Sequence, residues 1–164
     1  MNFVTQGNDQ FKGIINHLLT KNGGNISNQL QITFSSIGSG EAINVTHYDK
    51  NDYFQTNNFP RSYITFHFKG FSIIPKNYQI KTTNNGNYPK SWVIEASNDE
   101  CNWNRIAEEQ NNSLLNGPNQ SHIFSVYNPD SEGYSYIRMC LSGENWNHNN
   151  CLAINSFEFY GSLK

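Results

Sequence analysis

The amino-acid sequence predicts a single all-β domain, built as an antiparallel sandwich or a closed barrel. Three observations favour this fold class. Apolar and polar residues alternate over short stretches, turn-forming residues separate these stretches at intervals of roughly 8–12 residues, and no helices alternate with them. Aromatic residues make up 14% of the 164 residues and charged residues only 15%, a composition that suits strands better than helices. A chain of this length can bury about 70% of the surface that its unfolded form exposes.

The N-terminal part of the chain predicts one short helix. Residues 1–10 carry no periodic pattern and are expected to form a loose leader. Apolar residues at helical spacing follow, namely Phe11, Ile14, Ile15, Leu18 and Leu19. They predict a helix over residues 11–20, with Asp9 as its cap and Gly23 just past its end. So short a helix is stable only when it packs against the rest of the domain.

From residue 30 onward the pattern predicts strands. The expected strands cover residues 30–34, 63–68, 78–82, 92–97, 122–127, 134–141 and 152–160, with a further strand around residue 106. In the last segment the parity of the apolar residues changes between Ile154 and Phe157, which predicts a bulge or sharp twist near Asn155 and Ser156. The sequence contains no linker, so the domain is expected to span residues 11–161, followed by a tail of residues 162–164.

One hairpin, over residues 91–106, carries two of the three tryptophans. Trp92 begins a strand with period-two alternation, Asn98 and Asp99 supply turn-forming side chains, and Trp103 follows the turn. Large aromatic side chains contribute heavily to cores, so both tryptophans are expected to be buried. The rest of the expected aromatic core is Phe66, Phe68, Phe157 and Phe159.

Composition also limits the partners and the chemistry. The net charge of −2 and the scattered Lys and Arg residues argue against binding to nucleic acid or to anionic membranes. No stretch approaches the roughly 18 apolar residues of a membrane span. The five histidines are dispersed, and the sequence contains neither HExxH nor GxSxG nor a phosphate-binding glycine loop. The sequence therefore predicts a protein that is not an enzyme and requires no cofactor.

The cysteines and the N-terminus point to a reducing compartment. The three cysteines form no CxxC pair, and the polar N-terminus lacks the apolar region of a signal peptide. We therefore expect a cytoplasmic or nuclear protein whose cysteines are reduced, small and buried.

Six segments, in this order, resemble the coagulation factor 5/8 type C domain, also called the discoidin domain. They are ITFSS (32–36), RSYITFHFKG (61–70), YQIKT (78–82), WVIEASNDECNW (92–103), YIRM (136–139) and FEFYG (157–161). The N-terminal FKGIINHLL and the intracellular character look most like the versions attached to BTB–BACK proteins in protists. The resemblance implies a discoidin-type jelly-roll sandwich of about eight main antiparallel strands, with both termini at one end. It also matches Arg138 to the family's YIR arginine, expected to pair within the sheet with Glu95 or Glu158.

The same resemblance implies that ligands bind at loops on the opposite end of the sandwich. These loops are residues 37–42, 47–52 and 84–90, and the turn over residues 143–150 joins them because the last strand must start at that end. The candidate ligand-binding residues are His47, Tyr48, Asn85, Asn87, Tyr88, Lys90, Trp146 and His148. Members of the family that bind membranes expose large apolar residues on the first loop. Here Ile37 stands beside two glycines, so membrane insertion is not expected.

Two of these loops raise specific alternatives. Asp49 and Asp52 could hold Ca²⁺, as some members of the family do, or could simply be solvated. Trp146 could present a flat apolar face to a sugar ring or a partner, or could fold back and close the end of the barrel.

The sequence thus predicts a non-enzymatic intracellular binding module. The first hypothesis is a protein–protein interaction adaptor or a component of a larger assembly, acting through these loops. The alternative is lectin-like carbohydrate binding through the same loops, with or without Ca²⁺.

Overall fold

The computed structural model describes residues 1–5 and 11–164. Its elements, in chain order, are β1 (Asn2–Phe3), α1 (Ile14–Lys21), β2 (Leu30–Phe34), β3 (Ser39–Gly40), the 3-10 helix η1 (Ala42–Thr46), β4 (Phe54–Gln55), β5 (Tyr63–Phe68), β6 (Ile73–Lys81), β7 (Trp92–Ser97), β8 (Asn104–Glu109), β9 (Ser121–Ser125), β10 (Tyr136–Leu141), β11 (Ala153–Ile154) and β12 (Ser156–Leu163). Neither α1 nor η1 is long and apolar enough to cross a membrane.

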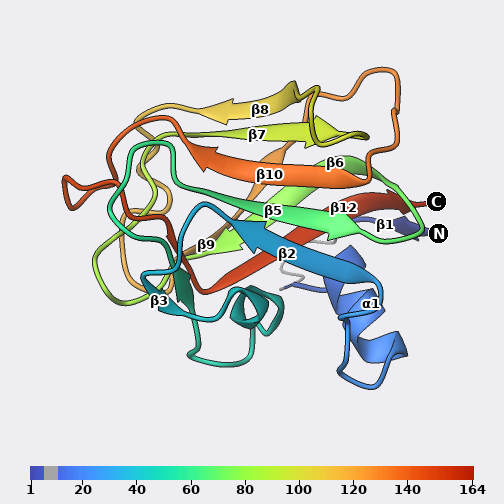
Figure 1. Ribbon diagram of the computed structural model, residues 1–164, viewed down its shortest axis with the longest axis horizontal. Helices are drawn as coiled ribbons and strands as arrows, with labels where there is room; N and C mark the ends of the chain where they lie inside the picture. Colours follow the sequence, from blue (N-terminus) through green and yellow to red (C-terminus); the bar gives the residue numbers. More distant parts are fainter. Residues whose placement is uncertain (6–10) are drawn as a thin grey trace.

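Two antiparallel sheets face each other and form the predicted sandwich (Figure 1). One sheet has the strand order β2-β5-β10-β7-β8, and the other has the order β1-β12-β6-β9. A short third sheet, β11-β4-β3, lies beside them. Eight strands are five residues or longer, as expected, and the four others contain only two residues each.

Aromatic rings from both sheets meet in the core. Phe66 of β5 lies 4.9 Å from Phe157 and 5.3 Å from Phe159, both on β12, between ring centroids. Trp92 of β7 is fully buried, and its indole Nε1 donates a hydrogen bond of 3.0 Å to the hydroxyl of Tyr78 on β6. Burial raises the pKa of that phenol, so the hydroxyl stays neutral. This bond therefore links the two sheets through the centre of the core.

Replacing Tyr78 with phenylalanine should lower the free energy of unfolding by about 1–2 kcal/mol, because the buried N–H of Trp92 would lose its acceptor. Urea denaturation would measure the loss. The matched control is Tyr127→Phe, since Tyr127 is 77% exposed and its hydroxyl can bond to water. Equal stability of the two variants would contradict the prediction.

Both termini lie at one end of the sandwich, as the resemblance implied (Figure 1). Asn2 pairs with Ser162 and Phe3 with Gly161, so the expected loose leader contains a strand. The expected tail is also wrong in part, because β12 continues to Leu163. The loops over residues 84–90 and 143–150 lie at the opposite end, which we call the loop end (Figure 1).

The helix α1 begins at Ile14 rather than Phe11, and Glu158 replaces the expected cap. The predicted cap, Asp9, lies outside the described residues. The Glu158 carboxylate on β12 accepts backbone N–H bonds at the start of the helix, from Gly13 (3.1 Å), Ile15 (2.7 Å) and Asn16 (2.9 Å). Glu158 is thus not the partner of Arg138. That partner is Glu95, at 3.4 Å.

The hairpin corrects two expectations about burial. Trp92 is buried as predicted, but Trp103 is half-buried on the outer face of the sheet, with the Arg138 guanidinium 3.9 Å from its ring centroid. Cys101, in the turn, is exposed, and only Cys151 is a buried cysteine. All three cysteines are free thiols.

The last segment bends at Asn155, where a bulge or sharp twist was predicted. Asn155 separates β11, which pairs with β4, from β12, which pairs with β6. The apolar parity changes there because the chain passes from the short sheet into the four-stranded sheet. The Asn155 amide fixes the crossing by donating to the carbonyl oxygens of Lys50 (3.1 Å) and Asp52 (2.7 Å).

Candidate functional site

Side-chain amides tie the predicted loops together at the loop end. The amide oxygen of Gln55 accepts hydrogen bonds from Asn85 (2.6 Å) and Asn87 (3.0 Å). The amide oxygen of Asn87 in turn accepts from Asn147 (3.1 Å) and Asn149 (2.9 Å). Asn85 and Asn87 were both predicted as ligand-binding residues, but their side-chain amides form hydrogen bonds with neighbouring segments of the chain. We assign them a structural role.

The turn over residues 143–150 is organised around Asn145, which is fully buried. Its amide nitrogen donates to Asn149 Oδ1 (2.8 Å) and to the carbonyl oxygen of Cys151 (2.9 Å). Its amide oxygen accepts from the backbone N–H groups of Asn147 (2.9 Å) and Asn149 (3.2 Å). Sequence reasoning missed Asn145. The signal was the asparagine-rich GENWNHNN, because asparagine side chains readily bond to nearby backbone.

Trp146 is half-buried and joins three loops, so neither of the two sequence-based alternatives describes it. Its indole Nε1 donates a hydrogen bond to the carbonyl oxygen of Asn112 (3.1 Å). Its backbone N–H donates to the carbonyl oxygen of Tyr88 (3.0 Å). The Lys90 ammonium lies 4.7 Å from the ring centroid. Trp146, Tyr88 and Lys90 therefore come together as predicted, but the ammonium occupies a position where a sugar ring would stack. His148 is exposed at the tip of the turn, in a left-handed conformation with φ of 57°.

A second group of residues lines a cavity of about 400 Å³, which we call the Tyr48 cavity. Its lining consists of Phe11, Tyr48, Asp49, Lys81, Asn119 and Ser121. The Tyr48 ring stacks on Phe11, with 5.7 Å between centroids and 10° between planes. Lys81, the last residue of β6, pairs with Ser121, the first residue of β9, so the cavity lies where these strands meet the loops. Of the predicted residues, this cavity brings together Tyr48 and Asp49.

The lining of the Tyr48 cavity offers varied polar chemistry beside an aromatic ring. Asp49 supplies a carboxylate acceptor, Lys81 an ammonium donor, and Asn119 and Ser121 groups that both donate and accept. Convergent polar groups around an apolar surface are typical of small-molecule sites, whose volumes are about 300–1,000 Å³. Sequence reasoning missed Phe11, Lys81, Asn119 and Ser121, which come from segments that are distant along the chain.

The Tyr48 cavity connects to the amide network through two hydrogen bonds. The backbone N–H of Asn119 donates to the carbonyl oxygen of Thr83 (3.0 Å), and the Thr83 hydroxyl donates to Asn85 Oδ1 (2.6 Å). His47 does not line the cavity. It is half-buried, with its Nδ1 3.4 Å from the hydroxyl of Thr46.

The acidic residues of the second loop do not form a cluster of metal ligands. Asp49 and Asp52 are both exposed. Within residues 1–5 and 11–164, no three His, Cys, Asp or Glu side chains lie close enough together to hold a metal ion. A Ca²⁺ ion at these aspartates would therefore depend on backbone carbonyl oxygens, of which that of Asp52 already accepts a bond from Asn155.

The loops also expose more apolar surface than the sequence indicated. Ile37 is 55% exposed, as its place beside two glycines suggested. Phe59 and Leu114 are 61% and 51% exposed, on the loops that precede β5 and follow β8. The expectation against membrane insertion counted only Ile37 and therefore stays a prediction.

Comparison of the sequence with protein-family models finds no match, and no curated protein matches it either. Several solved structures, in contrast, resemble the structure of this chain. CBM32-3, from a family 31 glycoside hydrolase of Clostridium perfringens, has a TM-score of 0.66 at 16% identity, covering 83% of this chain and 93% of that one. CpGH89CBM32-5 from the same organism, in complex with GalNAc-β-1,3-galactose, has a TM-score of 0.63 at 15% identity, covering 80% and 94%. Chitosan-binding module 1 of a chitosanase/glucanase from Paenibacillus sp. IK-5 has a TM-score of 0.61 at 18% identity, covering 82% and 96%.

At these identities the likeness establishes the fold. The chain has a discoidin-type jelly-roll β-sandwich, the fold of these carbohydrate-binding modules. The more specific resemblance to protist versions linked to BTB–BACK proteins stays a prediction.

Proposed function

We propose that this chain is a non-catalytic carbohydrate-binding module that holds a saccharide in the Tyr48 cavity. The observation that carries the proposal is the lining of that cavity, where an aromatic ring stands beside a carboxylate, an ammonium, an amide and a hydroxyl. Solved modules of similar fold support it, including one in complex with GalNAc-β-1,3-galactose. The lectin-like alternative thus takes precedence over the adaptor that the sequence first favoured.

The residues of the cavity would divide the recognition of a sugar between them. The C–H face of a sugar ring packs on Tyr48, whose ring is already oriented by Phe11. Asp49 accepts hydrogen bonds from sugar hydroxyls, while Lys81 donates to sugar oxygens. One carboxylate and one ammonium offset each other, which favours an uncharged sugar over an ionised one.

The cavity is proposed to bind without cleaving. Most glycoside hydrolases use two carboxyl groups, about 5–10 Å apart, on either side of the scissile bond. Among the residues that line the Tyr48 cavity, Asp49 is the single carboxylate.

Replacing Tyr48 with alanine should weaken sugar binding at least about tenfold, because the stacking surface is lost. A glycan array, with and without Ca²⁺, would identify the tightest-binding glycan, and isothermal titration with that glycan would measure the loss. Tyr48→Phe should retain most of the affinity, because the ring remains. Tyr127→Ala, which removes an exposed tyrosine outside the cavity, should bind as the unchanged protein does.

Two results would contradict the proposal. One is a glycan array without any saturable ligand. The other is a ligand whose affinity is the same for Tyr48→Ala and Tyr127→Ala. A requirement for Ca²⁺ would contradict the metal-free set of contacts described above and direct attention to the backbone carbonyls near Asp52.

A further inference from the structure

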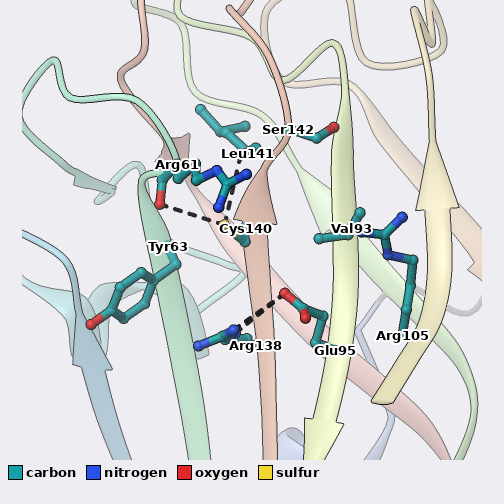
Figure 2. A pocket seen from close by; sticks show the side chains of 9 residues that line it. All are labelled: Arg61, Tyr63, Val93, Glu95, Arg105, Arg138, Cys140, Leu141 and Ser142. Atoms are coloured by element: carbon teal, nitrogen blue, oxygen red, sulfur yellow. Dashed lines mark hydrogen bonds and ion pairs between the residues drawn. The ribbon is translucent and has the colours of Figure 1, made fainter. Parts of the chain in front are cut away.

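The outer face of the five-stranded sheet carries a groove of about 420 Å³ (Figure 2), on the side of the sheet opposite the aromatic core. We call it the arginine groove. Its lining consists of Arg61, Tyr63, Val93, Glu95, Arg105, Arg138, Cys140, Leu141 and Ser142. None of these residues lines the Tyr48 cavity.

All three arginines of the chain line this one groove, whereas none of the eight lysines does. The arginines come from separate segments: Arg61 precedes β5, Arg105 belongs to β8 and Arg138 to β10. Arginine differs from lysine in presenting a planar fork of N–H donors, which matches the two oxygens of a carboxylate or the oxygens of a sulfate or phosphate. The groove thus gathers guanidinium groups in particular, and not merely positive charges.

Strand register explains how the sheet assembles the groove. Arg138 of β10 stands opposite Glu95 of β7, and Glu95 stands opposite Arg105 of β8. Cys140 stands opposite Tyr63 of β5 on one side and Val93 of β7 on the other. Residues that face each other directly on neighbouring strands have Cβ atoms about 4.5–5.5 Å apart. Two adjacent rows of side chains therefore form the floor.

Arg138 is the fixed member of the three arginines. Its Nε and Nη2 both lie 3.4 Å from Glu95 Oε1. Its guanidinium also lies over the Trp103 ring, at 3.9 Å, and near the Tyr63 ring, at 5.8 Å from the centroid. Arg138 and Glu95 together form a nearly neutral pair in the floor of the groove.

Arg61 and Arg105 remain available for a ligand. Figure 2 shows them on opposite sides of the groove, with the Arg138–Glu95 pair lower between them. The partner of Arg105 is Glu108 at 3.2 Å, but both side chains are about half exposed, and such pairs contribute little. The Arg61 guanidinium has no hydrogen bond or ion pair with any residue in the described part of the chain.

The backbone at Arg61 adopts an unusual conformation that the groove itself stabilises. Its φ is 61°, in the left-handed region that non-glycine residues seldom occupy. The Cys140 thiol donates to the Arg61 carbonyl oxygen at 3.4 Å. Burial raises the pKa of that thiol, so it stays neutral near pH 7 and does not compete with an anion.

We propose that the arginine groove is a second binding site, which takes an oxyanion, a carboxylate or a sulfate, between Arg61 and Arg105. Three guanidinium groups and one carboxylate line the groove, and even with Glu108 beside Arg105 this leaves a net positive charge, which favours an anion. Its volume accommodates a small molecule that carries the oxyanion, such as an acidic monosaccharide, as well as the free ion. This site lies outside the Tyr48 cavity, and its existence does not depend on the function proposed for that cavity.

Titration of ¹⁵N-labelled protein by NMR at pH 7 and low salt would test the site with three probes: glucuronic acid, sodium sulfate and glucose. We expect glucuronic acid and sulfate to shift the amide signals of Val93, Cys140 and Ser142 in a saturable manner, and glucose to leave them unchanged. Tighter binding of glucuronic acid than of sulfate would identify the ligand as an acidic sugar. Equal binding would identify the free ion.

Two variants make the test specific. Arg61→Gln should weaken the binding of glucuronic acid about tenfold, because one charge-assisted contact is lost. Lys76→Gln removes the same charge from an exposed position on the other sheet and should leave the affinity unchanged. Equal losses in the two variants would overturn the proposal, since they would indicate unspecific attraction. So would the absence of any shift at the groove, or shifts confined to residues of the Tyr48 cavity.

Discussion

Replacing Glu158 with alanine is expected to lower the free energy of unfolding by about 4 kcal/mol. The carboxylate accepts four backbone N–H bonds, three at the start of α1 and one, at 2.8 Å, from Phe159. Glu158 is 1% exposed, so water cannot replace it fully at these donors. Each buried donor left without a partner costs about 1–3 kcal/mol, and α1 would lose the group that fixes its first turn. Urea denaturation would measure the effect.

The same carboxyl group should make stability depend on pH. Burial raises the pKa of Glu158 from 4.5 to about 7, although the four N–H donors act in the opposite direction. Between these two values the folded state binds more protons than the unfolded state. The free energy of unfolding should therefore fall as the pH rises from 4.5 through 7, by an amount on the order of 3 kcal/mol.

A glutamine at position 158 provides the matched control for the pH dependence. Glu158→Gln keeps one acceptor oxygen but cannot titrate, so its stability curve should lack the component that falls between pH 4.5 and 7. The difference between the two curves isolates Glu158 from the other titrating groups. A difference that stays constant, or that grows with pH in favour of the unchanged protein, would contradict the raised pKa.

Replacing Gly161 with alanine should lower the free energy of unfolding by about 3 kcal/mol or more. This is the second of the two largest effects that we expect. Gly161 follows a register shift in the pairing of β12 with β6, and its φ is 142°. A Cβ atom there would lie 2.0 Å from the backbone carbonyl oxygen of Ile74, which cannot move without disturbing β6. The cost combines this overlap with a backbone conformation that side chains rarely adopt.

Gly70→Ala is the control that separates the two contributions. Gly70 also has a positive φ, 78°, but a Cβ atom added to it would meet nothing within 4 Å. We expect the free energy of unfolding of this variant to fall by only about 1 kcal/mol, because only the backbone conformation is unfavourable there. Thermal and urea unfolding of both variants would measure the contrast. Equal losses of stability in the two variants would show that the backbone of β6 moves aside from the added Cβ atom at little cost.

The sequence predicted the parts of the fold that depend on local pattern. Ile64, Phe66 and Phe68 alternate because one face of β5 packs on the core, and all three are fully buried. Trp103 was misplaced because the parity of one strand does not continue through a turn into the next. The cap of α1 was missed because Glu158 lies 142 residues after Asn16, and only the packing of the helix on β12 brings them together.

The candidate sites were predictable only in part, for the same reason. The loop end was correctly located from the resemblance and the direction of the last strand. The Tyr48 cavity, however, also needs Phe11, Lys81 and Asn119, which no spacing in the sequence connects. The three arginines looked scattered along the chain, because cross-strand register, which the sequence does not contain, is what places Arg138 and Arg105 on either side of Glu95.

The neighbouring termini determine how the domain can be displayed. The N-terminal amine of Met1 donates to the carbonyl oxygen of Leu163 at 3.2 Å, at the end of the sandwich opposite the loops. A tether attached at either terminus would therefore orient the loops outward. Several copies on one scaffold would engage a multivalent surface together, and such avidity can exceed the affinity of a single copy by about 10²–10⁴. Weak individual binding would then be compatible with firm attachment.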